Sequence, residues 1–506
     1  KVRFYKIETL LHTICVFGDN LRGFRCRFVV ILYDRKTTPM TCLNHASLAA
    51  SLAALTVAAD AAAASKPKSP AGKRPAVIVI MTDQQTAGAM SCAGNPWVET
   101  PAMDALAADG VRFTRAYCPY PLSGPCRAAL VTGRMPFEVG AFDNAIRPND
   151  ADMRAGIGHR LAEAGYECLY AGKWHVPEVN LPDSGTGFRR ISKMDDPALA
   201  DACDAALKEY DGQKPLFLVA SLLNPHEICE YGRNETLHYG ELAPFSTDEC
   251  PNLPANFMPS TYAAEALTLE HASSPRYHDT YTYTEDDWRR YLYAYYRLVE
   301  RVDREVGRIV GVLKARGLYD DAAIIFLSDH GDGVAAHGWN QKWNLQEEVI
   351  NVPLIVKPPK GSGPRGVCND EALSNVGLDL YVTVCDYAGL TPDPGRYRGR
   401  SLRPVAEGRQ ATLHDEVFVE TLLPGPGMRG WSVVGKRYKY VLYQWGRNRE
   451  ALYDLEADPG EMVNLAVDRR YEAELNRLRR AMYDRGVGIG DPKLVRNLRP
   501  YAETRN

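Results

Sequence analysis

The chain has 506 residues, of which 45% are hydrophobic and 24% charged, and its formal net charge is −3. This is the composition of a globular protein longer than one ordinary domain, so we expect a large α/β domain with a smaller part beside it. A charge this close to neutrality favours neither nucleic acid nor a membrane surface as a partner.

Residues 1–75 differ from the rest and are predicted to be an extension. The chain begins with Lys1 and its first methionine is Met40, so residues 1–39 are either translated non-coding sequence or start at an alternative codon. The Ala-rich stretch 46–64 resembles a secretory signal and predicts a periplasmic or secreted protein, although no Lys or Arg lies between Met40 and Ala46. The alternative is an alanine-rich tail. Residues 66–74 are then a linker, and no apolar run after them is long enough to span a membrane.

The cysteines do not indicate a disulfide framework. Nine of the 12 follow residue 75, without a CxxC pair, and nine is an odd number. We expect Cys118 and Cys126 to be small buried side chains rather than ligands.

The first predicted elements alternate between strand and helix. The apolar run 76–81 predicts a buried parallel strand that delivers Thr82, Asp83 and Gln84 at its carboxyl end. Further along the chain, helices are predicted at 101–109 and 155–164, and strands at 166–170 and 215–223. The last of these strands ends in Asn224, Pro225 and His226.

A long helix is predicted at 285–316, after an irregular segment at 230–285 that either lines a site or is a surface insertion. Thr284 and Asp287 are expected to cap this helix, and Gly317 to end it. Its apolar residues recur at helical spacing and predict a core face: Trp288, Leu292, Tyr295, Val299, Val302, Val306, Ile309 and Leu313.

Strands at 323–327 and 353–357 complete the alternation, which predicts a doubly wound α/β sheet with helices on both faces. From about residue 400 the pattern changes to short strands at 417–420, 431–434 and 438–442 and a last helix at 471–483. We therefore expect an extension at 1–75, a catalytic domain at 76–405 and a small C-terminal α+β subdomain at 406–506.

Three of the predicted strands end in polar clusters: Asp83-Gln84, His226 and Asp329-His330. Ligands of open α/β sheets bind beyond the carboxyl ends of strands. Paired carboxylates with amide or imidazole suit a divalent cation, and oxygen-rich ligation favours calcium or magnesium. Any one such aspartate has the alternative role of capping a helix.

Lys173 and His175 follow the strand at 166–170 and are spaced to face an anion together. A surface charge and a packed histidine are the alternative.

The segment from Ser123 to Arg134 has a more specific pattern, with Pro125 two residues and Arg127 four residues after Ser123. Proline is favourable in a first helical turn, and the positive N-terminus of the following helix would lie under Ser123. Arg127, one helical turn later, would lie on the same face of this helix as Ser123. A helix merely capped by Ser123 is the alternative.

Together with Thr132, Gly133 and Arg134, this segment resembles the maturation motif of type I, formylglycine-dependent sulfatases. Further matches follow in the family's order: TDQQ at Thr82, GKWH at Gly172, NPH at Asn224, SDHGD at Ser328 and LYDLEADPGEMVNLA at Leu452. They span residues 76–467. The resemblance implies an alkaline-phosphatase-like fold and hydrolysis of a sulfate ester, on a sulfated small molecule or glycan.

The resemblance also implies a role for each site residue. Asp83, Gln84, Asp329 and His330 would hold one Ca2+, with Mg2+ less favoured, and the modified Ser123 would reach it. His330 is often Asn in relatives, and imidazole is a poorer calcium ligand than oxygen. The remaining roles concern the sulfate: Arg127 and Lys173 steady the formylglycine hydrate, His175 bonds it, Lys342 contacts sulfate oxygens, and His226 or Lys342 protonates the leaving alcohol. His337 is expected near the pocket without a role.

Spacing chooses Ser123 over Cys126 as the modified residue, because Cys126 has Ala128 rather than proline at +2. A serine at this position implies a radical maturation enzyme as partner. Two other functions stay open: a phosphate or phosphonate ester hydrolase of the same superfamily, and a non-catalytic glycan-binding relative.

Overall fold

The computed structural model describes residues 10–15, 28–33, 74–176, 183–273, 280 and 282–503. The chain divides into two compact units, Lys1–Ala71 and Gly72–Asn506. In the first, strand β1 (Leu10–Cys15) pairs antiparallel with β2 (Phe28–Tyr33). The predicted signal at 46–64 and nearly all of the linker lie outside the described residues.

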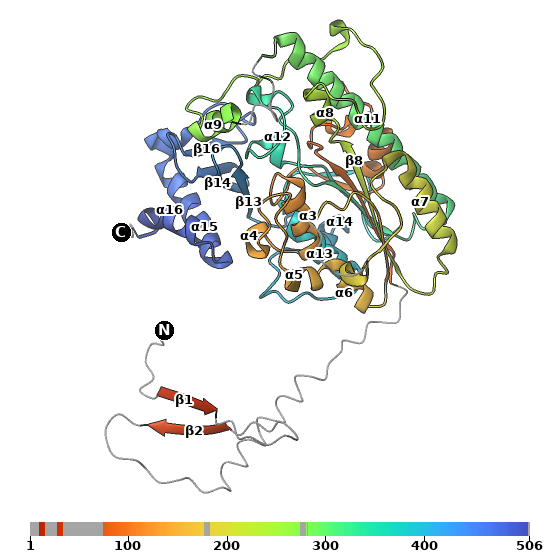
Figure 1. The fold of residues 1–506 in the computed structure, drawn as a ribbon, viewed down its shortest axis with the longest axis horizontal. Coiled ribbons are helices and arrows are strands. Elements are labelled where there is room, and N and C mark those ends of the chain that lie inside the picture. The colour runs from red at the N-terminus through yellow and green to blue at the C-terminus, as the bar shows by residue number, and fades with distance from the viewer. Residues whose placement is uncertain are drawn as a thin grey trace. The chain divides into compact units, whose positions relative to one another are not determined.

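The second unit is built on an eight-stranded sheet of order β11-β4-β10-β9-β3-β8-β6-β7 (Figure 1). Its strands are β3 (Val77–Asp83), β4 (Val111–Phe113), β6 (Glu167–Gly172), β7 (Arg189–Arg190), β8 (Leu216–Pro225), β9 (Ala323–Ser328), β10 (Leu354–Lys357) and β11 (Val367–Asn369). β3 is fully buried and runs parallel to both β8 and β9, which confirms the strand predicted at 76–81.

The sheet is mixed rather than wholly parallel, because β10 runs antiparallel to β9 and to β4. A parallel neighbour requires a crossover that returns the chain to the other end of the sheet, usually through a long helix. The only helix that the structure describes between β9 and β10, apart from a single 3-10 turn, is α12 (Glu347–Ile350). The chain therefore re-enters the sheet at the end where it left.

Helices cover both faces of the sheet, as predicted (Figure 1). On one face α11 (Glu285–Ala315) packs against α2 (Pro101–Ala108), α7 (Asp196–Glu209) and β8. On the other face α3 (Ser123–Thr132) packs against α13 (Val376–Tyr387) and α6 (Ile157–Glu163). The short elements are α4 (Pro136–Val139), α5 (Asp150–Arg154), α8 (Ile228–Gly232), α14 (Arg403–Ala406), β5 (Ala116–Tyr117) and β12 (Ser374–Asn375).

Two predicted segments differ from the structure. The helix expected at 155–164 begins two residues later, as α6, because Gly156 adopts an extended backbone and is its N-cap, and the unpredicted short helix α5 precedes it. The irregular segment at 230–285 contains an unpredicted helix, α9 (Glu265–Ser273), whose apolar residues form no clear stripe. The long helix is confirmed: Thr284 Oγ1 accepts a hydrogen bond from the Asp287 backbone N–H at 3.3 Å.

The C-terminal part is an antiparallel sheet covered by helices, as expected of an α+β subdomain. The sheet order is β13-β14-β15-β16, with β13 (Glu416–Leu423), β14 (Met428–Gly435), β15 (Tyr438–Tyr443) and β16 (Glu450–Asp454). The last helix is longer than predicted, α15 (Glu472–Ile489), and is followed by an unpredicted α16 (Pro492–Glu503).

A buried lysine of β15 links the C-terminal sheet to helix α12. The Lys439 ammonium lies 3.0 Å from Glu347 Oε1 and 2.8 Å from Glu461 Oε1. Glu347 begins α12, so the C-terminal sheet fixes the end of the loop that follows β9. Among the described residues, no helix is long and apolar enough to cross a bilayer. The nine cysteines that follow residue 75 are unpaired, and Cys118 and Cys126 are buried as predicted.

Candidate functional site

The three polar strand ends meet at one edge of the sheet. Thr82 on β3 pairs with Ser328 on β9, which sets Asp83 beside Asp329. On the other side of β3, Asp83 pairs with Pro225 at the end of β8, next to His226. Parallel strands deliver their carboxyl ends to the same edge, so this convergence follows from strand direction.

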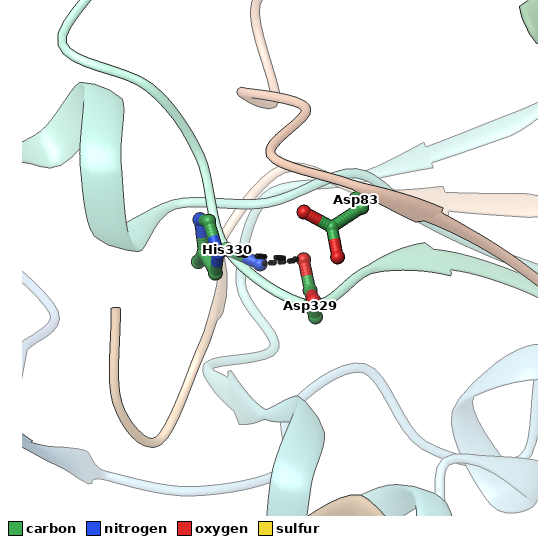
Figure 2. A group of neighbouring side chains, drawn as sticks. All are labelled: Asp83, Asp329 and His330. Carbon is green, nitrogen blue, oxygen red and sulfur yellow. Dashed lines mark hydrogen bonds and ion pairs between the residues drawn. The ribbon is translucent and has the colours of Figure 1, made fainter. Parts of the chain in front are cut away.

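Asp83, Asp329 and His330 form a cluster with no exposed surface (Figure 2). Each offers one ligand atom, and these atoms lie within 4.8 Å of one another. His330 Nδ1 is 2.9 Å from the Gly331 carbonyl oxygen, so the Nδ1 proton is donated there and Nε2 keeps its lone pair. Two carboxylates and an imidazole nitrogen are a donor set that fits a divalent cation.

Ser123 lies directly against this cluster. Its Oγ is 2.9 Å from His330 Nε2 and 3.3 Å from Asp83 Oδ1, and the residue is fully buried. Ser123 is the first residue of α3, and Leu122 is the N-cap. The serine is therefore not a mere helix cap; its hydroxyl faces the cluster above the positive end of α3.

Arg127 and Lys173 balance the two carboxylates. Arg127 Nη2 is 2.8 Å from Asp83 Oδ2, and its Nε is 2.8 Å from Asp329 Oδ2. Lys173 Nζ is 2.7 Å from Asp83 Oδ2. Burial by itself raises the pKa of Asp83, but the charges of Lys173 and Arg127 outweigh it and hold the pKa well below its ordinary value.

Gln84 turns its side chain toward Lys342. Its Oε1 accepts a hydrogen bond from Lys342 Nζ at 2.7 Å and lies 3.4 Å from the Cys229 thiol, while its Nε2 donates to Asp332 Oδ2 at 2.7 Å. The expected role of Gln84 as a calcium ligand stays a prediction. The geometry adds a second role, because the same amide holds Lys342 at the site.

Asp332 is a site residue that the sequence reasoning missed. It is fully buried and accepts hydrogen bonds from Gln84 Nε2, from the Tyr291 hydroxyl at 3.1 Å, and from the backbone N–H groups of Val334 and Gln341 at 2.9 and 3.1 Å. Burial raises the pKa of Asp332 to about 6, against the effect of these donors. The available signal was its position at the end of the SDHGD motif.

The tyrosines of α11 serve the site as well as the core. Tyr295 donates its hydroxyl to the Gln84 carbonyl oxygen at 2.8 Å and accepts from the Thr86 N–H at 2.9 Å. The apolar stripe predicted burial of Tyr295 correctly, but it could not indicate where the hydroxyl would bond.

The two predicted histidines line a pocket of about 880 Å³ beside Lys173. His175 is exposed and His226 is half-buried. Burial, with the positive charges of Lys173 and Lys342, lowers the pKa of His226 well below its ordinary value, so its ring is neutral at neutral pH. His337 does not line this pocket; it lies with Glu348 and Glu461.

Comparison with known proteins agrees with this geometry. Residues 75–390 match the family model described as sulfatase, and residues 335–486 match one described as N-sulphoglucosamine sulphohydrolase, C-terminal. The chain belongs to the sulfatase family. It is a sulfuric ester hydrolase with an alkaline-phosphatase-like fold, and the expected family and activity are confirmed.

Similar relatives come from Bacteroides thetaiotaomicron. The sulfatase is 30% identical to a Δ4,5-hexuronate-2-O-sulfatase, with 79% of this chain and 86% of the relative covered. It is 26% identical to an N-acetylglucosamine-6-O-sulfatase, with 83% and 87% covered. The solved structure of a putative sulfatase from this organism matches with a TM-score of 0.73 at 28% identity, covering 83% of this chain and 93% of that one.

Asparagine in place of Asp332 should disturb the site without touching its substrate. The Asn amide group would face at least one of the donors that Asp332 accepts, and Lys342 would lose its fixed partner Gln84. We expect kcat/KM on an aryl sulfate to fall by about tenfold to a hundredfold, the equivalent of about 1.5–3 kcal/mol for a hydrogen bond to a charged group. Inhibition by inorganic sulfate should weaken in parallel. The matched control is Asp286→Asn, at an exposed position on α11. Full activity in a folded Asp332→Asn enzyme would contradict this role.

Proposed function

We propose that this sulfatase hydrolyses a sulfate ester of a carbohydrate, using a formylglycine made from Ser123 and one bound Ca2+. The observation that carries the proposal is the contact of Ser123 Oγ with His330 Nε2 and Asp83 Oδ1, at 2.9 and 3.3 Å. A small oxygen nucleophile beside a cation site, above a helix N-terminus, is the arrangement that sulfate transfer requires.

The cation would be held by Asp83, Asp329, His330 and the oxygen of residue 123, with Gln84 as a further ligand. A bound divalent cation favours the deprotonated form of a hydroxyl group beside it and stabilises developing negative charge. Calcium is favoured over magnesium because it accepts irregular ligand geometry more readily.

The side chains around residue 123 supply the remaining steps. A formylglycine hydrate at residue 123 would supply a hydroxyl group as the nucleophile toward sulfur. Arg127 and Lys173 hold negative charge at this hydroxyl, and Lys342 at the sulfate oxygens, each such contact being worth about 3 kcal/mol in rate. The negative charge of a bound sulfate would offset the charges of Lys173 and Lys342 and raise the pKa of His226, which then donates the proton to the departing alcohol. His175 would accept a proton when sulfate is expelled.

The burial of Ser123 supports an order of maturation in which the serine is converted before folding. Ser123 has no exposed surface and is followed by buried Gly124 and Pro125. We propose that a radical maturation enzyme converts the serine before α3 folds, because the side chain is inaccessible in the folded protein.

The substrate class is proposed from the relatives and from the pocket. The relatives are sulfatases of a hexuronate and of N-acetylglucosamine, and the pocket of about 880 Å³ is far larger than a sulfate group alone. We therefore propose a sulfated glycan or its fragments, and a periplasmic or secreted location for the enzyme.

Phosphate or phosphonate ester hydrolysis is the alternative activity. A phosphonate monoester hydrolase of Agrobacterium radiobacter shares the fold, with a TM-score of 0.65 at 22% identity. We expect the matured enzyme to have a higher kcat/KM on an aryl sulfate than on the matching aryl phosphate, and Ser123→Ala to abolish both activities with the fold retained by circular dichroism. Sulfate hydrolysis that survives in Ser123→Ala would refute the mechanism, and a preference for phosphate would favour the alternative.

Substitution of His226 should depend on the leaving group. An alcohol of a sugar needs a proton as it leaves, whereas 4-nitrophenolate does not. We expect His226→Ala to lower kcat on a sugar sulfate by about 10²–10⁴-fold and kcat on 4-nitrophenyl sulfate far less. His238→Ala, at another histidine that lines the pocket, is the matched control. Equal losses on both substrates would assign the proton to another group, with Lys342 the first candidate.

A further inference from the structure

The wall of the pocket carries a lysine outside the catalytic centre. Among the described residues, its lining includes Lys173, Arg190, Lys193 and one carboxylate, Glu230. Lys173 is engaged by Asp83 in the catalytic centre, and Glu230 Oε1 accepts from Arg233 at 3.4 Å. Lys193 therefore adds a positive charge to this wall outside the centre itself.

Arg190 and Lys193 belong to a segment that the sheet holds beside Lys173. Arg190 lies on β7 and pairs in parallel register with Tyr170 on β6, whose strand leads directly into Lys173. Ser192 Oγ accepts a hydrogen bond from the Gly172 N–H at 3.0 Å. The segment 190–193 is thus tied to the segment that bears Lys173.

A second connection ties this segment to His226. The carboxylate of Asp196, which follows it at the start of α7, accepts hydrogen bonds from the N–H groups of Leu223 and Asn224 at 2.7 and 2.9 Å. The Asp196 N–H donates to the Tyr239 hydroxyl at 3.1 Å. The segment 190–193, the end of β8 next to His226, and Tyr239 are therefore held in one geometry.

The two cations differ in how they are held. The Arg190 guanidinium lies 5.0 Å from the ring centroid of Trp174, between the catalytic Lys173 and His175 in sequence. This cation–π contact orients Arg190 along the wall. Lys193 is exposed, and within the described part of the chain no carboxylate forms an ion pair with it. Its ammonium is available to a ligand in the pocket.

We propose that Lys193 binds a second anionic group on the substrate, either a carboxylate or a second sulfate ester. This inference rests on the proposed function, because the first sulfate must lie at Lys173 and Lys342. A single sulfate ester is neutralised inside the catalytic centre and has no need of Lys193. A sugar that carries a further acid on a neighbouring carbon or a neighbouring residue would bridge both regions.

The test compares a sulfated uronide with its methyl ester, which removes the carboxylate charge and keeps the sulfate. The measurement is made at about 0.5 M salt, where long-range electrostatic attraction is screened. The matured enzyme should prefer the acid by about tenfold or more in kcat/KM, because the ester cannot form the charge-assisted hydrogen bonds of the carboxylate. Lys193→Gln should bring the ratio of acid to ester close to one. The matched control is Lys214→Gln, exposed just ahead of β8 at the opposite end of the sheet, which should keep the wild-type ratio.

A second arm identifies the source of the anion. A disulfated monosaccharide replaces the uronide, with its monosulfated form as reference. A preference for the uronide acid indicates a carboxylate, and one for the disulfated sugar indicates a second sulfate. Equal rates on all charged and uncharged pairs, or a preference that Lys193→Gln leaves intact, would overturn the proposal.

A binding measurement separates this inference from the proposed function. Calorimetry with the Ser123→Ala protein and each doubly charged sugar needs no turnover, and Lys193→Gln should weaken the Kd about tenfold for the preferred one. If 4-nitrophenyl sulfate is not hydrolysed by the matured enzyme, the proposed function fails, and this Kd still decides the second site. A Kd unaffected by Lys193→Gln refutes the second site alone.

Discussion

The rest of this structure depends on two carboxylates that are buried together at one site. Asp83 and Asp329 have no exposed surface and lie side by side at the ends of β3 and β9. Like charges in such a place need compensating cations, and removing one partner of a buried pair costs about 3–5 kcal/mol. Arg127 bridges both carboxylates, and it stands one helical turn after Ser123. The contact that neutralises the aspartates therefore also fixes the reactive residue against them.

A second set of contacts positions the sulfate-binding lysine. Gln84 holds Lys342 through its amide oxygen and is itself held by Asp332 and Tyr295, so the long helix α11 acts on the site through its hydroxyl groups. Beyond Lys342 the chain enters α12, where Glu347 meets Lys439 of the C-terminal sheet. The C-terminal subdomain is thus part of the support of the active site, although it contributes no residue to the expected metal site.

The sequence predicted the elements whose signal is local. The apolar run before Asp83 and the turn residues after each strand predicted parallel strands with polar ends, and strand direction alone then brought Asp83, Asp329 and His226 to one edge. The maturation motif indicated Ser123, and the geometry brings its hydroxyl to the cluster. The direction of β10 could not be predicted from its apolar composition, because it depends on the connection between strands.

The orientation of buried polar side chains was the other feature that could not be predicted from the sequence. Gln84 was expected at the metal, yet its amide contacts Lys342 and Asp332, because the choice between these partners depends on residues more than 240 positions away in the chain. Asp332 and the hydroxyl groups of Tyr291 and Tyr295 were missed for the same reason. Burial is readable from periodicity, whereas the partner of a buried polar atom is a property of the assembled fold.

The most direct test of the account is the mass of the peptide that contains residue 123, taken from active enzyme made in its native host. The account predicts a formylglycine, which makes the peptide lighter than the encoded serine peptide by two hydrogen atoms, in proportion to sulfatase activity. An unmodified serine in fully active enzyme would contradict it, because the hydroxyl beside the Asp83 cluster would then have to act without conversion.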